Sequence, residues 1–150
     1  MTHIRTTHVG SLPRSQEVTD FLFSKEKNQA YNATHFDEVM KKHVDLIVSR
    51  QKDCGIDIVS DGETSKISYA TYVKDRYTGF SGDSPRNAPA DLIMFPTFLQ
   101  RLADSGGTPE YTRPMCTGEV KPLSNSELKK DISNLKSAIK KYGNIHGFMN

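Results

Sequence analysis

The stretch that most constrains the fold is Gly55 to Glu63, which reads Gly-Ile-Asp-Ile-Val-Ser-Asp-Gly-Glu. A glycine suited to ending a helix is followed by a β-prone run, Ile56 to Ser60, and then by an acidic turn. In parallel α/β folds, ligands bind just past the carboxyl ends of the strands. We therefore take Asp61 and Glu63 as the first candidates for contact with a substrate.

A long amphipathic helix is predicted immediately before this strand. Thr34 with Asp37 resembles a capping box in which Asp replaces the usual Glu or Gln. Gly55 is placed to end the helix in the left-handed conformation. Eight positions at helical spacing share one face, and nearly all of them are apolar: Phe36, Val39, Met40, His43, Val44, Ile47, Val48 and Gln51.

Further strands and helices alternate along the rest of the chain. The predicted strands are Ile4 to Ser11, Met115 to Lys121 and the start of another at Ile145 to Met149. Ser15 is suited to cap a short helix, Pro96 to begin a second, and Ser124 with Glu127 to form the capping box of a third that ends at Gly143. Thr64 to Ala90 has no clear period and is predicted to be a long loop with some helical turns.

Strands that alternate with helices indicate an α/β fold with a parallel sheet. A complete (β/α)₈ TIM barrel needs about 250 residues, and this chain has 150. We therefore predict one domain over residues 1–150. It is the amino-terminal half of a TIM barrel, with about three βα units and the start of a fourth strand. Because such a half leaves open sheet edges, we expect a homo-oligomer or a missing carboxyl-terminal half to cover them.

Composition narrows the class of protein. A net charge of +2, from basic residues interleaved with acids, argues against a nucleic-acid partner. No apolar run has the length of a membrane span, so no membrane association is expected. Two cysteines in unrelated contexts favour a reducing cytoplasm. Cys54 is predicted to be buried and Cys116 to be a structural residue within a strand.

Three stretches taken together resemble one family. They are Arg5-Thr6-Thr7-His8-Val9-Gly10-Ser11-Leu12-Pro13-Arg14, then Gly55 to Glu63, then Arg113-Pro114-Met115-Cys116-Thr117-Gly118-Glu119-Val120. In this order they resemble the cobalamin-independent methionine synthases, of the single-domain, methionine synthase II-like type. The resemblance extends over essentially all 150 residues and matches the amino-terminal part of that family's barrel.

The resemblance implies both an activity and a division of roles. Family members are zinc enzymes that transfer a methyl group from a methylfolate to the thiol of homocysteine. Val9, Gly10 and Ser11 would hold the carboxylate of the amino acid, Glu63 its ammonium group, and the region from Arg113 to Cys116 would lie near the folate. The family's zinc ligands, a His-x-Cys pair with further Cys or Glu, belong to the carboxyl-terminal half. We therefore expect a truncated product or a fragment that binds no zinc by itself.

Each candidate side chain also has a purely structural interpretation. Glu63 could be a solvated turn carboxylate, and Ser11 a turn hydroxyl. Asp61 could act as a general base or cap the turn after it. His8 could contact substrate or be satisfied by backbone. No catalytic residue and no metal ligand is assigned within the chain.

Two other functions remain open. One is a non-catalytic half-barrel that binds a small amino acid, a thiol or a partner chain. The other is a related transferase with a different thiol or alkyl donor.

Overall fold

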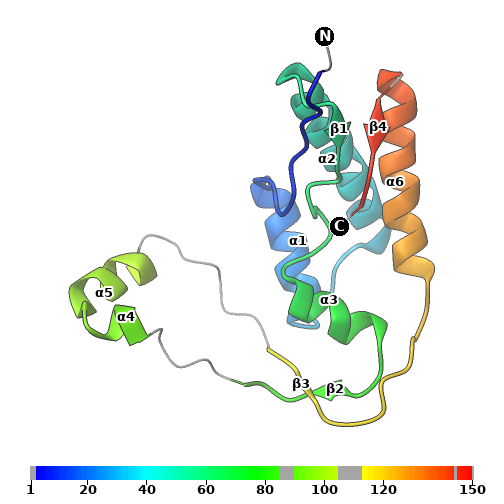
Figure 1. Cartoon of the computed structure of the whole chain (residues 1–150). Coiled ribbons are helices and arrows are strands. Elements are labelled where there is room, and N and C mark those ends of the chain that lie inside the picture. Colours follow the sequence, from blue (N-terminus) through cyan, green and yellow to red (C-terminus); the bar gives the residue numbers. More distant parts are fainter. Residues whose placement is uncertain (1–2, 85–89, 105–112, 144, 150) are drawn as a thin grey trace.

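The computed structural model describes residues 3–84, 90–104, 113–143 and 145–149 (Figure 1). Helices and short strands alternate within these residues, which makes the fold mixed α/β. In chain order the elements are α1 (Gln16–Glu26), α2 (Ala33–Asp53), β1 (Ile58–Val59), α3 (Tyr69–Arg76), β2 (Phe80–Ser81), α4 (Ala90–Ile93), α5 (Pro96–Asp104), β3 (Met115–Cys116), α6 (Ser126–Tyr142) and β4 (His146–Gly147).

A small parallel sheet lies at the centre of the fold. β1 pairs with β4 in parallel, with Ile58 opposite His146 and Val59 opposite Gly147. Thr7 forms a parallel bridge with Ile58 on the other side of β1. α2 and α6, which precede β1 and β4 in the chain, pack side by side along this sheet (Figure 1). The Thr7 segment, β1 and β4 are therefore neighbours in the order in which they occur in the chain.

The core forms on the face of α2 that the sequence predicts. All eight positions of the predicted face are buried, and they are the buried residues of this helix. Towards the start of α2 they pack against Val18 and Leu22 of α1. Towards its end they pack against Val59 of β1 and Leu135 and Ala138 of α6. Burial of this stripe provides the hydrophobic stabilisation that joins the helices to the sheet.

The third predicted strand is real, but it does not belong to the parallel sheet. β3 pairs antiparallel with β2, with Phe80 opposite Cys116. Gly79 permits the close approach of this ribbon, because a Cβ there would lie 2.6 Å from the carbonyl oxygen of Gly118. The prediction that Met115 to Lys121 adds a third βα unit is therefore wrong, and β4 takes the third place in the parallel sheet.

Helix ends follow the prediction where the signal is a single residue. Ser15 accepts a hydrogen bond from the backbone N–H of Val18 at 3.3 Å and caps α1. Pro96 begins α5. Gly55 has φ +77° just beyond α2, and Gly143 ends α6 with φ +64°.

Two predicted capping boxes are not formed. α2 is capped by Asn32, which accepts from the N–H of His35, and Asp37 instead contacts Lys130 of α6. α6 begins after Asn125 without a side-chain cap, and Glu127 turns towards α1. In both cases the acidic side chain of the predicted box forms an ion pair with a helix that is distant in the sequence.

Cys54 is exposed, which contradicts its predicted burial. It follows the last residue of α2 as the C-cap, where the chain leaves the buried helical face. None of the helices described here combines the length and apolar character needed to cross a membrane.

Candidate functional site

The first two sequence motifs meet at one edge of the parallel sheet. Thr7 and Val59 are the last paired residues of adjacent parallel segments, so His8 to Ser11 and Ser60 to Glu63 follow them on the same side. The carboxyl ends of parallel strands form the ligand-binding edge of such sheets. The structure therefore brings together two segments that are about fifty positions apart in the chain.

A short hydrogen bond joins the two segments. The hydroxyl of Ser11 donates to Oε2 of Glu63 at 2.7 Å. The backbone N–H of Leu12 donates to the carbonyl of Gly62 at 3.0 Å. Ser11 is exposed and Glu63 is half-buried, so a ligand can reach both polar groups.

The turn that carries Glu63 has an unusual backbone. Gly62 has φ +61°, and Glu63 has φ +53°, the left-handed region that disfavours side chains other than glycine. A Cβ on Gly62 would lie 3.0 Å from both Ile47 and Leu12, so this position is closed to larger residues. A non-glycine residue held in this region costs on the order of 1–3 kcal/mol and persists only when its surroundings impose it.

The buried side chain of Asp61 stabilises this turn. Its side chain is buried at 2% exposure, and Oδ1 accepts a hydrogen bond from the N–H of Glu63 at 3.1 Å. Its carbonyl accepts from the Thr64 hydroxyl at 2.7 Å. This geometry matches the capping alternative for Asp61, because its buried carboxylate accepts from the backbone of Glu63.

His8, Val9 and Gly10 of the first motif differ in their exposure and in the groups that they present. The Nε2 atom of His8 is shielded from solvent and has no hydrogen-bond partner within the described structure. Val9 is 69% exposed, and Gly10 has φ +97°, which lets the backbone turn before Ser11. A buried imidazole nitrogen is costly to leave unpaired. Because this atom is shielded from solvent, a ligand reaches it only if the segment around His8 moves.

Arg14 contributes to the site although the sequence assigns it no role. Its Nη2 donates to the carbonyl of Glu63 at 2.8 Å and also to that of Lys66, and its Nε donates to Thr64 at 3.2 Å. Burial lowers the pKa of Arg14, while the charges of Glu63 and Asp61 raise it. The signal in the sequence was its place in the first motif, four residues after Gly10.

His43 is a second residue near the site without a predicted role. It is buried on the inner face of α2, and its Nε2 has no partner among the described residues. Burial lowers the pKa of His43, and a hydrogen bond to the Pro13 carbonyl opposes that shift. The signal was a polar residue on an otherwise apolar helical face.

Arg113 and Cys116 lie on a different part of the fold. The N–H of Arg113 donates to Oδ1 of Asp83 at 2.9 Å, and the exposed Cys116 is opposite Phe80 in the ribbon. Figure 1 shows this ribbon beyond α3, away from β1 and β4. The Arg113–Asp83 bond and the pairing of Cys116 with Phe80 are thus separate from the Ser11–Glu63 contact.

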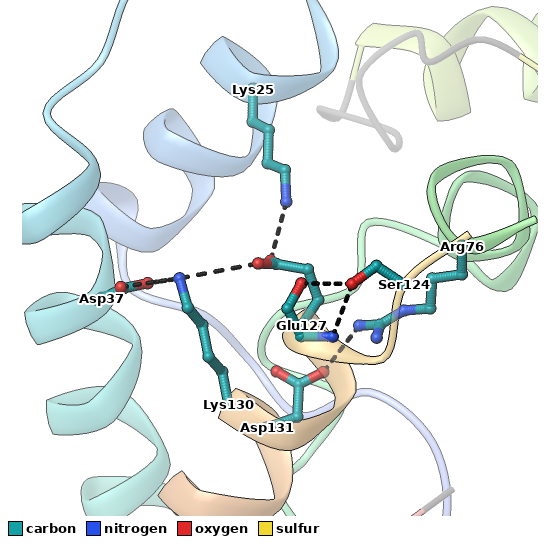
Figure 2. Close-up of polar contacts among 8 residues, drawn as sticks. Lys25, Asp37, Arg76, Ser124, Glu127, Lys130 and Asp131 are labelled. Atoms are coloured by element: carbon teal, nitrogen blue, oxygen red, sulfur yellow. Dashed lines mark hydrogen bonds and ion pairs between the residues drawn. The ribbon is translucent and has the colours of Figure 1, made fainter. Parts of the chain in front are cut away.

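A network of charged residues ties the helices together next to a cavity of about 50 Å³ (Figure 2). Glu127 of α6 contacts Lys25 of α1 at 3.2 Å and Lys130 at 3.7 Å, and Lys130 contacts Asp37 of α2 at 2.9 Å. Opposite charges alternate through this network. The network therefore joins the helices and does not form a binding site for ligands of one charge.

The most buried ion pair of this network joins α3 to α6. Arg76 donates to Oδ2 of Asp131 at 2.9 Å, and their side chains are only 12% and 10% exposed. The guanidinium also lies 3.9 Å from the centre of the Tyr72 ring. Burial raises the pKa of the Asp131 carboxyl, and the charge of Arg76 opposes this.

The described residues do not fit a zinc centre. Among them, no three His, Cys, Asp or Glu side chains are grouped so that they could hold a metal ion. Zinc in proteins requires three or four such ligands.

Comparison of the sequence with known proteins shows which family the chain belongs to. Residues 4–84, more than half of the chain, match the family described as "Cobalamin-independent synthase, Catalytic domain". The 5-methyltetrahydropteroyltriglutamate–homocysteine methyltransferase of Neisseria gonorrhoeae is 26% identical over an alignment of length 148 that covers 85% of this chain and 19% of that protein. The enzyme of the same name from Corynebacterium glutamicum is 23% identical over an alignment of length 147 that covers 84% of this chain and 19% of the relative.

A third relative with this name, from Desulforamulus reducens, is 29% identical over 75 residues, 50% of this chain and 10% of its own length. The chain thus spans between a tenth and a fifth of the length of these curated relatives. The matched region 4–84 contains both motifs that meet at Ser11 and Glu63. The chain belongs to the family of cobalamin-independent synthases, to which it is matched through their catalytic domain.

Proposed function

We propose that this chain supplies the amino-acid-binding part of a methyltransferase that acts on homocysteine and a methylfolate. The observation that carries the proposal is the 2.7 Å contact between Ser11 and Glu63 at the carboxyl ends of adjacent parallel segments. Family membership and the names of the relatives support the same class of reaction.

The chemistry of the two segments suits the two ends of an amino acid. A fixed carboxylate such as Glu63 binds an ammonium group through charge-assisted hydrogen bonds. The backbone of Val9 and Gly10 offers neutral donors to a carboxylate, and the hydroxyl of Ser11 adds one once it is released from Glu63. His8, whose Nε2 lacks a protein partner, can serve as a further polar contact.

The folate and metal parts of the reaction are placed elsewhere in this proposal. Arg113 and Cys116 remain our assignment for the folate region, and the exposed position of Cys116 leaves its surface open to a large ligand. When zinc is bound, the family's chemistry uses it to keep the substrate thiol ionised and nucleophilic. We expect its ligands to lie outside this chain.

Calorimetric titration with L-homocysteine and L-methionine tests the proposal. Glu63→Gln removes the charge that would pair with the ammonium group while preserving the shape of the side chain. We expect this substitution to raise the dissociation constant by about tenfold, because a hydrogen bond to a charged group typically contributes at least the corresponding free energy.

The matched control is Glu38→Gln, an exposed carboxylate on α2 that interacts with His35. This variant should bind as the unmodified chain does. Equal affinities for the unmodified chain and Glu63→Gln would remove Glu63 from the site, and absence of binding to the unmodified chain would reject the proposed amino-acid site altogether.

A further inference from the structure

The buried face of α2 contains only two residues with polar side chains, His43 and Gln51, among its eight members. Each faces one of the two segments that form the candidate site. His43 meets the carbonyl of Pro13, in the first motif. Gln51 meets Ser60, in the second. Ile47, which lies between them on this face, is in contact range of Gly62.

The Gln51 amide pairs with the backbone of Ser60 as a neighbouring strand would. Its Nε2 donates to the Ser60 carbonyl at 2.8 Å, and its Oε1 accepts from the Ser60 N–H at 3.0 Å. The same Nε2 also donates to the carbonyl of Ile47, one turn earlier in α2, at 3.1 Å. The amide is thereby fixed to its own helix while it holds the strand.

Ser60 needs such a partner because the parallel pairing has ended. The last sheet contact of β1 is made by the Val59 carbonyl, which accepts from the N–H of Phe148 at 3.0 Å. Ser60 is fully buried, so water cannot satisfy its backbone groups. A buried backbone group left without a partner costs about as much as a lost hydrogen bond.

The position of Glu63 depends on that of Ser60. Ser60 is followed directly by Asp61 and Gly62, and its hydroxyl accepts from the N–H of Gly62 at 3.3 Å. Gly62 is confined between Ile47 and Leu12, and Glu63 is held to Asp61. A displacement at Ser60 therefore moves the carboxylate that contacts Ser11.

We infer that Gln51 is a positioning residue for the amino-acid site: its amide fixes the turn that presents Glu63 to Ser11 and to the substrate. The substrate part of this inference rests on the proposed function. The fixing of the turn does not, and it can be measured without any ligand.

The ligand-free test uses nuclear magnetic resonance of the full chain. Gln51→Met preserves the length of the side chain and removes both the donor and the acceptor. We expect the Ser60 amide proton to exchange with solvent at least about tenfold faster, since its buried partner is lost. We also expect the amide signals of Gly62 and Glu63 to shift. Unchanged exchange and unchanged signals would overturn the inference.

The ligand test uses Gln51→Glu and a pH series. A protonated carboxyl group has one donor and can form both bonds to the Ser60 backbone, although not the additional bond to the Ile47 carbonyl, whereas a carboxylate can only accept. For each pH we take the ratio of the dissociation constant of Gln51→Glu for L-homocysteine to that of the unmodified chain. This ratio should rise as the pH is raised. Gln51→Met should give a raised ratio, about tenfold, that does not vary with pH.

Both tests have outcomes that separate the two proposals. Gln29→Glu, at an exposed position, is the control and should leave every ratio at unity. A Gln51→Glu ratio that is flat with pH would overturn the inference. If the unmodified chain binds no amino acid, the proposed function fails, and the exchange of the Ser60 amide still decides whether Gln51 fixes the turn. Thermal unfolding of each variant ensures that affinities are compared between folded proteins.

Discussion

Asp57 ties the first extended segment to the start of β1 through three hydrogen bonds. Oδ2 accepts from the backbone N–H of Thr6 at 2.7 Å and from its hydroxyl at 2.9 Å, and Oδ1 lies 2.8 Å from His3. These contacts, led by the backbone N–H, lower the pKa of Asp57 from 3.8 to about 2. Asp57 precedes β1, at the opposite end from Glu63, where residues of such sheets contribute to stability.

A lowered carboxyl pKa makes part of the folding stability depend on pH. The contribution of Asp57 is complete above its unfolded pKa and is lost as the pH falls through the folded value of about 2. We expect Asp57→Asn to be less stable than the unmodified chain near neutral pH. The difference should narrow below pH 3.8 and approach its minimum only below pH 2.

Urea unfolding at a series of pH values measures this difference. Asp20→Asn, which changes an exposed carboxylate of α1, is the control and should show a much smaller pH dependence. A gap between the unmodified chain and Asp57→Asn that stays constant down to pH 2 would show that Asp57 does not have the assigned pKa.

At the scale of elements, α2 organises both the core and the site. Its apolar positions pack against α1, β1 and α6. Its two buried polar residues face the segments that carry Ser11 and Glu63. One helix thus contacts both motifs, although they follow different strands. This explains why the buried face of α2 contains two polar residues, His43 and Gln51.

The Arg76–Asp131 pair is the corresponding link between α3 and α6. Removing one partner leaves the other charge buried, so Arg76→Met or Asp131→Leu alone should each lower the free energy of unfolding by about 3–5 kcal/mol. The double variant Arg76→Met/Asp131→Leu should cost clearly less than the sum of the single changes, because no charge is then left unpaired.

A double-mutant cycle by urea unfolding measures this coupling. The exposed pair of Lys121 and Glu119 is the control, because solvent-exposed ion pairs contribute only about 0–1 kcal/mol. Additive effects of Arg76 and Asp131 would mean that the pair does not act as a unit in joining the two helices.

At the scale of the molecule, the described chain contains three parallel segments in sequential order, backed by α2 and α6. This arrangement agrees with the α/β class of the prediction. The half-barrel, the cytoplasmic location and the oligomer that would cover the open sheet edges remain predictions.

The zinc content of the purified chain tests the expectation that the metal ligands lie outside it. We expect the purified 150-residue chain, incubated with zinc and then dialysed, to retain far less than one zinc per chain, since the described residues lack a ligand cluster. Elemental analysis by mass spectrometry gives the ratio. Stoichiometric zinc that survives dialysis would place a metal site in this chain and would contradict our assignment of the ligands elsewhere.

Local signals predicted much of the structure. The eight-residue face of α2 and the ends marked by Ser15, Gly55 and Gly143 are confirmed, because helical spacing and caps depend on neighbouring residues. Glu63 and Ser11 could also be selected, since their motifs follow β-prone runs. Their direct contact is consistent with the prediction of one shared site, although their ligand remains a proposal.

Non-local pairing explains the errors. An extended run such as Met115 to Lys121 has the same pattern in a parallel sheet and in an antiparallel ribbon, and only its partner β2 distinguishes them. Glu127 and Asp37 left their predicted capping boxes because lysines from other helices lie within reach. Arg14 and Gln51 could not be assigned roles because their partners are backbone groups, which have no sequence signature.

The sequence by itself determined α1, α2, α5 and α6, the acidic turn after β1 and the family, since these depend on short-range spacing and on motif residues. It did not determine α3, which lies in the stretch Thr64 to Ala90 that is predicted to be a long loop with some helical turns. Tertiary structure alone decided that Gly62 is enclosed by Leu12 and Ile47, that Ser11 reaches Glu63 and that Gln51 completes the strand. The physical reason is that a buried backbone group must find a partner in space. Which side chain satisfies it depends on how α2 packs against the sheet.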